Sequence, residues 1–171
     1  MKTTEIHSIS SASSNTFTKQ FIASGILLGL GLGGFFDGIV LHQILQWHHM
    51  LSNVRPMLSM EDVKVNTIAD GLFHLADYGF TIAGITLLWR THQQSEIPKS
   101  AKPFVGSILI GAGLFNLVEG IIDHHILGIH YVRSGAHHLL WDIAFLASGA
   151  ILITIGLVLV EQWKNIDKSI T

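Results

Sequence analysis

The sequence contains no cysteine, which excludes disulfide bonds, thiolate metal ligands, cysteine nucleophiles and iron–sulfur clusters. Charged residues are also scarce: they fill 13% of the 171 positions, against about 25% in a typical soluble domain. The formal net charge of -2 provides no strongly basic surface, so nucleic acid is excluded as a partner. Hydrophobic residues make up 49% of the chain and the mean hydropathy is +0.47, which indicates a membrane protein.

Four apolar segments approach or exceed the roughly 20 residues that a helix needs to cross a bilayer. They run from about residue 21 to 45, 68 to 89, 104 to 127 and 139 to 160. The second is the weakest, because Asp70, His74 and Asp77 interrupt its first half. The sequence therefore predicts an all-α integral membrane four-helix bundle, with the lipid bilayer as its principal partner.

The polar ends of the chain are expected to lie outside the membrane domain. Residues 1–20 are predicted to form a loose tail, residues 21–161 a single membrane domain, and residues 162–171 a second tail. Lysine and arginine are enriched in the cytoplasmic loops of membrane proteins. One side of the predicted topology holds Lys2, Lys19, Arg90, Lys99, Lys102, Lys164 and Lys168, and the other holds only Arg55, Lys64 and Arg133. We therefore expect both termini in the cytoplasm and the protein in a bacterial inner membrane.

The first and third apolar segments resemble each other. Residues 29–48 and 111–130 align without gaps, and the alignment pairs Gly38 with Gly120, His42 with His124, His48 with His130, and Asp37 with Glu119. Apolar composition alone would align leucines and isoleucines, but not a carboxylate, a glycine and two histidines in register. The alignment predicts two tandem helical hairpins, about 21–90 and 103–161, related by a pseudo-twofold axis along the membrane normal.

Histidine is the most unusual component of the chain. Nine of the eleven histidines fall where the predicted spans meet one side of the membrane: His42, His48, His49, His74, His124, His125, His130, His137 and His138. Carboxylates accompany them on the same helix faces, as in the pairs His74/Asp77 and His138/Asp142. An ionisable group at membrane depth costs about 2.5–3.5 kcal/mol on insertion scales. A cation, a proton or hydrogen bonds must therefore compensate Asp37 and Glu119.

A transition metal ion (Cu, Zn or Fe) is the first hypothesis, because imidazoles and carboxylates are common ligands of such ions in helical bundles. The predicted inner ligand set is Asp37, His42, His74, Asp77, Glu119, His124, His138 and Asp142, and the predicted outer set is His48 and His130. One dinuclear centre and two mononuclear centres both fit this duplicated pattern. His49, His125 and His137 lack counterparts of the same type and are expected to be solvated.

An unbroken helix does not bring the first-half ligands together. At 100° per residue, Asp37 and His48 point within about 20° of each other, whereas His42 is turned away by about 140°. All three side chains can reach one ion only if the helix unwinds or bends, and Gly38 and Gly120 are the expected places.

Other interpretations stay open at this point. Haem held by axial histidine needs only one or two of these residues, and a metal-free proton relay or transporter needs no ion at all. With a metal, the protein would act in metal handling or in respiratory-enzyme assembly, as a homo-oligomer or with a membrane partner. A membrane oxidoreductase or hydrolase that uses the same centre on a lipid-soluble substrate is the alternative.

The histidine motifs also resemble a known family. The segments FFDGIVLHQILQWHHM, NLVEGIIDHHILGIHYVR and WDIAFL are similar to those of a bacterial family of predicted integral membrane proteins, classed as a domain of unknown function. The resemblance extends from about residue 21 to 160. It implies a four-helix protein of the inner membrane, but it implies no ligand and no activity.

Overall fold

The computed structural model describes residues 2–94, 98 and 100–170. Lys99 and the ends of the two predicted tails, residues 1 and 171, therefore lie outside the described residues. The elements in chain order are α1 (Lys2–Phe36), η1 (Asp37–Ile44), α2 (Met60–Gln94), α3 (Lys102–Glu119), η2 (Gly120–Ile126) and α4 (His138–Ile170). Both η1 and η2 are π-helices that continue the preceding α-helix. No strand occurs in this part of the chain, which confirms the all-α prediction.

Four helical stretches are long and apolar enough to cross a membrane, as predicted. They are Phe17–Ile44, Met60–Gln93, Lys102–Ile126 and His138–Asn165. The second extends beyond the predicted range at both ends, and Glu61 and Asp62 lie in the first turn of α2. Acidic side chains are favourable there because the amino end of a helix carries a partial positive charge.

The structure differs from the prediction of a loose tail over residues 1–20. Helix α1 begins at Lys2, so the polar segment is helical and continuous with the first span. No glycine or proline occurs between Lys2 and Ser24. Because these are the residues that interrupt helices most strongly, nothing in this stretch stops the helix from propagating outward from the span.

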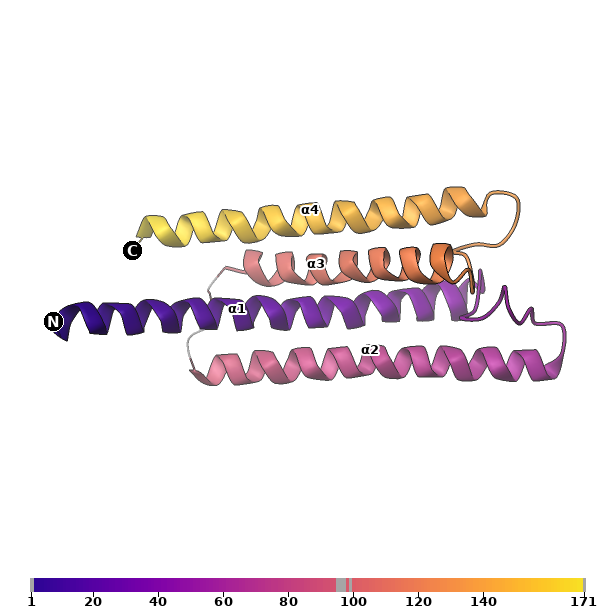
Figure 1. Ribbon diagram of the computed structural model, residues 1–171, viewed down its shortest axis with the longest axis horizontal. Helices are drawn as coiled ribbons and strands as arrows, with labels where there is room; N and C mark the ends of the chain where they lie inside the picture. The colour runs from indigo at the N-terminus through magenta and orange to yellow at the C-terminus, as the bar shows by residue number, and fades with distance from the viewer. Residues whose placement is uncertain (1, 95–97, 99, 171) are drawn as a thin grey trace.

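The helices lie in a row rather than at the corners of a square. Figure 1 shows the order α4, α3, α1, α2, with both chain ends on the side opposite η1 and η2. The central helices α1 and α3 pack on each other, while α2 packs on α1 and α4 packs on α3. Within the described residues, α2 and α4 do not touch each other. The outer helices consequently expose apolar side chains such as Leu72, Leu75 and Ile151, which suits contact with lipid.

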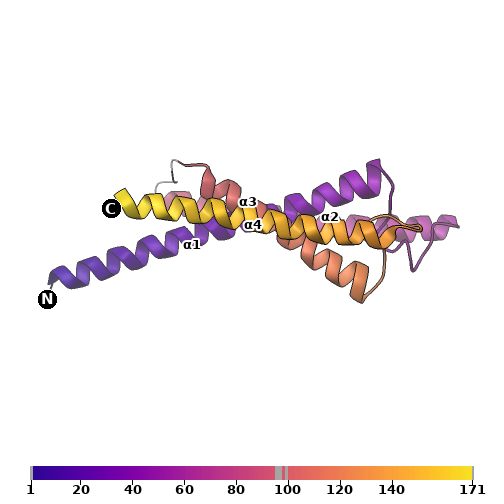
Figure 2. The ribbon, with the colours of Figure 1, turned by 90° about the horizontal axis from the view of Figure 1, so that it is seen from above.

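Glycines allow the two central helices to cross in contact (Figure 2). A Cβ atom added to Gly29 would lie 2.8 Å from the Cα atom of Gly111, and the reverse addition gives the same distance. Small residues at such a crossing let the two backbones approach, which is the usual basis of helix association in membranes. The crossing fixes how the far ends of α1 and α3, which carry η1 and η2, face each other.

We expect alanine at this crossing to destabilise the protein. Gly29→Ala and Gly111→Ala each place a methyl group against backbone atoms, and overpacking of this kind costs about 1–3 kcal/mol. Gly79→Ala is the matched control, because a Cβ there meets nothing within 4 Å and gains the same helix propensity. Heat-induced aggregation in detergent measures the difference. Equal midpoints for all three variants would contradict a close crossing.

Candidate metal centre

The helices α1 and α3 change to π-helix at matching places before they end. In the first half, Leu45 N–H donates to Val40 O at 2.8 Å, and in the second half Leu127 N–H donates to Ile122 O at 2.8 Å. The next residues, Gln46 and Gly128, have positive φ values of 50° and 60° and reverse the chain. Positive φ is easy for glycine and uncommon for glutamine, so Gln46 is the strained member of the pair.

This wider turn solves the angular problem posed by the sequence. A π-helical hydrogen bond joins residues five apart, so it brings Asp37 and His42 toward the same face. The Oδ2 atom of Asp37 lies 2.9 Å from Nε2 of His42. The unwinding that the sequence requires near Gly38 and Gly120 is therefore present at both positions.

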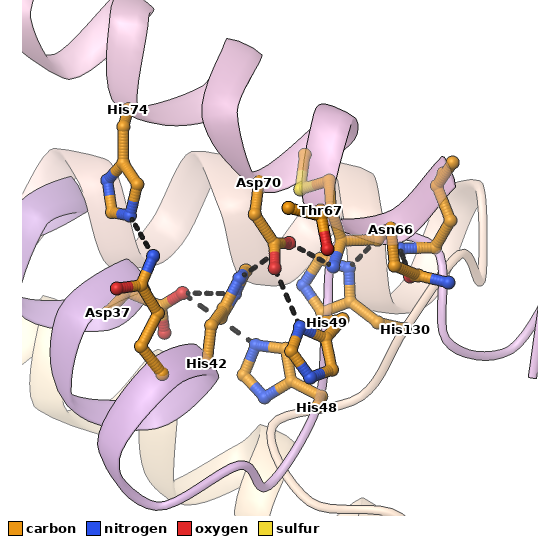
Figure 3. A network of polar contacts seen from close by, with 12 residues as sticks. Asp37, His42, His48, His49, Asn66, Thr67, Asp70, His74 and His130 are labelled. Atoms are coloured by element: carbon orange, nitrogen blue, oxygen red, sulfur yellow. Dashed lines mark hydrogen bonds and ion pairs between the residues drawn. The ribbon is translucent and has the colours of Figure 1, made fainter. Parts of the chain in front are cut away.

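Four buried side chains from both halves of the chain meet at the end of α1 and α3. One ligand atom from each of His42, His48, Glu119 and His130 lies within 4.8 Å of the other three, and such a set can hold a metal ion. We call these residues the central group. Asp37 lies beside them, with its Oδ2 atom 3.7 Å from Nε2 of His48 (Figure 3). On the other side, Oε1 of Glu119 lies 3.4 Å from Nε2 of His130.

Each imidazole of the central group is anchored through its Nδ1 atom to a group that accepts hydrogen bonds. His42 donates to Oδ1 of Asp70 at 3.1 Å, His48 to the carbonyl of Val132 at 2.8 Å, and His130 to the carbonyl of Met50 at 3.1 Å. These acceptors place the ring proton on Nδ1 in a neutral imidazole. The lone pair of each ring then lies on Nε2 and faces the centre, as in metal-binding histidines.

Two further carboxylates hold the surroundings of the centre in place. Asp70 accepts from His42, from His49 at 2.6 Å and from the backbone N–H of Met50 at 2.9 Å. Asp142 plays the matching part in the second half of the chain. It accepts from the backbone N–H of Val132 at 2.9 Å and lies 3.3 Å from His124 and 3.7 Å from His138.

The atoms that face the centre have no hydrogen-bond partner among the described residues. They include Nε2 of His42, His48 and His130, Oδ2 of Asp37, and both carboxylate oxygens of Glu119. Burial, together with the neighbouring His48 and His124, lowers the pKa of His130 to about 3, so this ring is uncharged at neutral pH. Lone pairs and carboxylate oxygens that face one another in a buried space are unfavourable unless a cation or shared protons compensate them.

The structure arranges the predicted ligands differently from the inner and outer sets expected from the sequence. His48 and His130, predicted to be outer ligands, belong to the central group, because the turns at Gln46 and Gly128 fold the chain back over the π-helices. His74 and His138, predicted to be inner ligands, lie at the rim, with side chains 21% and 41% exposed. If the first and third helices continued straight, His48 and His130 would lie farther from the centre than His74 and His138, because a straight helix carries His48 and His130 away from the membrane.

His74 and Asp77 form a separate pair on α2, beside η1. The Nδ1 atom of His74 lies 3.6 Å from Oδ2 of Asp77, and its Nε2 atom contacts Nε2 of Gln43 at 3.2 Å. A Cβ at Gly34 would collide with the Asp77 carboxylate, and one at Gly38 would collide with the His74 ring. Because Gly34 and Gly38 have no side chain, His74 and Asp77 can pack directly against the backbone of α1 and η1.

Some residues of the site were not recognised from the sequence. Asp70 shares a helix stripe with His74 and Asp77, but the pattern gave no sign that it anchors His42. His49 was predicted to be solvated, yet it is half-buried and bonded to Asp70, whereas His125 and His137 are exposed as predicted. The backbone carbonyl groups of Met50 and Val132 could not be predicted as anchors, because every residue has a backbone carbonyl and the residue type does not show which one accepts a hydrogen bond.

Comparison with known proteins identifies a family but no characterised relative. No curated protein and no solved structure matches the chain. A family model described as "Predicted membrane protein (DUF2243)" matches residues 24–163, which overlap all four apolar helical segments and include the central group. The chain therefore belongs to the DUF2243 family of predicted membrane proteins.

Proposed function

We propose that this membrane protein carries a resident transition metal bound by His42, His48, Glu119 and His130. The centre would lie near the outer surface of a bacterial inner membrane, at the end of the helices opposite the two termini. The observation that supports the proposal is the convergence of three imidazole Nε2 atoms and a carboxylate, all buried and without a hydrogen-bond partner in the described part of the chain.

A metal explains this arrangement better than protons do. A proton shared between Asp37 and His42 would compensate only that pair, and it would leave the Nε2 atoms of His48 and His130 buried close together without a hydrogen-bond partner. The rings of these two histidines stack at 4.6 Å with an interplanar angle of 4°. An ion accepts lone pairs from several directions at once, so it compensates the whole group.

The ligand types favour zinc, iron or copper(II). Imidazole suits all three metals, and the carboxylate of Glu119 adds a harder ligand, while the chain has no thiolate to select copper(I). Haem is disfavoured, because it uses only one or two axial histidines and would leave the other buried ligand atoms of this group uncompensated.

Burial favours a metal that stays in place over one that passes through. The central group is closed off, with His42 and His130 both 0% exposed, whereas metal delivery requires ligands that a partner protein can reach. Passage across the membrane is disfavoured as well, because the backbones of α1 and α3 touch at Gly29 and Gly111 below the centre.

A membrane metalloenzyme is the second candidate function. His74 and Asp77 are an imidazole and a carboxylate beside Asp37 that the anchoring of the central group does not use. Such a pair can accept and donate protons during a reaction at the metal. Because the His74 side chain is partly exposed on the outer helix α2, this pair favours a substrate that approaches from the lipid.

Elemental analysis of the full chain, purified in mild detergent without chelators, tests the metal. We expect bound zinc, iron or copper in the wild-type protein and loss of this metal in His130→Ala, because that variant removes a ligand of the central group. His125→Ala is the control, since His125 is an exposed histidine close to the centre in sequence. A wild-type protein that retains none of the three metals, even after incubation with each and dialysis, would contradict the proposal.

A further inference from the structure

The centre contains more unsatisfied ligand atoms than one four-coordinate ion can bind. Besides the atoms of the central group, Oδ2 of Asp37 and Nε2 of His124 are buried and without hydrogen-bond partners among the described residues. Zinc sites in proteins usually have four ligands, and the central group alone supplies four. A single ion in the central group would therefore leave Asp37 and His124 uncompensated.

Six of the residues with buried, unsatisfied atoms form two sets that the alignment pairs, one from each half of the chain. Asp37, His42 and His48 form the first set, and their partners in the ungapped alignment, Glu119, His124 and His130, form the second. The ring centroids of His42 and His48 lie 4.3 Å apart at 69°, and those of His124 and His130 lie 4.8 Å apart at 74°. The two histidine pairs thus share their relative ring geometry, and each set adds one carboxylate.

One histidine of each set has an equivalent anchor. His48 donates to the carbonyl of Val132, and His130 donates to the carbonyl of Met50, so each half of the chain holds a histidine of the other. The backbone N–H groups of these same two residues donate to Asp142 and Asp70, respectively. Anchors of this kind orient metal ligands, and here both sets of ligands have them.

We propose that the centre holds two metal ions, one for each half of the chain. The first ion would be bound by the set Asp37, His42, His48 and the second by the set Glu119, His124, His130. This inference rests on the proposed metal centre and divides the four residues of the central group between two ions. Ions in two-metal sites lie about 3.5–4 Å apart, so ligands of neighbouring ions approach one another closely. Two ions at this spacing would explain why the ligand atoms of the central group, which lie within 4.8 Å of one another, come from both sets.

The ligand chemistry points to divalent ions of intermediate softness. Each set has two imidazoles and one carboxylate, which suit zinc or iron. Each set also supplies three protein ligands, and three-ligand sites commonly keep a further position for water or substrate. A pair of such ions fits the catalytic candidate better than a purely structural role.

Metal stoichiometry tests this inference. Metal-free full-length protein in detergent is titrated with Zn(II), and the bound zinc is measured per chain. We expect two zinc ions per chain in the wild type, one in His124→Ala, and two in the control His125→Ala, which alters the exposed neighbouring histidine. One ion in both the wild type and His124→Ala would overturn the second site but retain the first. No bound zinc, iron or copper would instead overturn the proposed function itself.

A spectroscopic measurement on the wild type keeps the inference testable if His124→Ala does not fold. Two Cu(II) ions at the spacing of a two-metal site are magnetically coupled and give a half-field signal in electron paramagnetic resonance. We expect this signal when the wild-type protein is loaded with two equivalents of Cu(II). A spectrum that contains only isolated Cu(II), together with one bound zinc per chain, would overturn the proposal.

Discussion

Removal of the metal by a chelator is expected to lower the thermal stability of the protein strongly, and metal re-addition should restore it. Without an ion, the carboxylates of Asp37 and Glu119 and the lone pairs of the central group face one another in a buried space. Binding to the folded state stabilises it by about 4.1 kcal/mol when the free metal concentration is 1,000 times the dissociation constant. Thermal unfolding in detergent, followed by circular dichroism at several free zinc concentrations, measures the effect.

A variant without the central site provides the control for this experiment. In the double variant His42→Ala, His130→Ala, the melting temperature should no longer depend on zinc or on the chelator. The expected stabilisation would be contradicted by an identical shift in this variant, because the chelator would then act elsewhere. It would also be contradicted by a wild-type melting temperature that does not change with free zinc.

Replacement of Asp70 by alanine is expected to weaken metal binding by about 10–100-fold, although Asp70 lies outside the central group. The substitution removes the acceptor that fixes the proton of His42 on Nδ1 and its lone pair on Nε2. It also releases His49 and the backbone N–H of Met50, whose carbonyl group holds His130. One change therefore disturbs the orientation of two central-group histidines.

Competition with a chromophoric chelator of known zinc affinity measures this loss. Asp62→Ala is the matched control, because Asp62 also lies on α2, and its polar contacts among the described residues are with Ser59, Arg55 and Asn66 near the start of the helix. Wild-type affinity in Asp62→Ala and weaker binding in Asp70→Ala would support an anchoring role. Equal affinities in the two variants would show that Asp70 does not orient His42.

The local pattern of the sequence was sufficient to predict the elements of the fold and the end of the molecule that carries the site. Four long apolar segments can satisfy their backbone hydrogen bonds in a membrane only as helices, which made the all-α prediction secure. The paired positions of Asp37 and Glu119, and of His42 and His124, are visible in a single chain. A straight-helix calculation was also enough to show that the helix must unwind near Gly38 and Gly120, as it does.

The tertiary structure alone decided which ligands lie at the centre. His48 and His130 come inside because the chain reverses at Gln46 and Gly128, and His74 and His138 stay at the rim. The anchoring acceptors depend on contacts between distant segments: the carbonyl of Val132 reaches His48, and that of Met50 reaches His130. Helical periodicity determines which residues share one face of a segment. It does not determine the direction in which the chain leaves the helix or the backbone groups that it then contacts, because both depend on how the two halves of the chain pack.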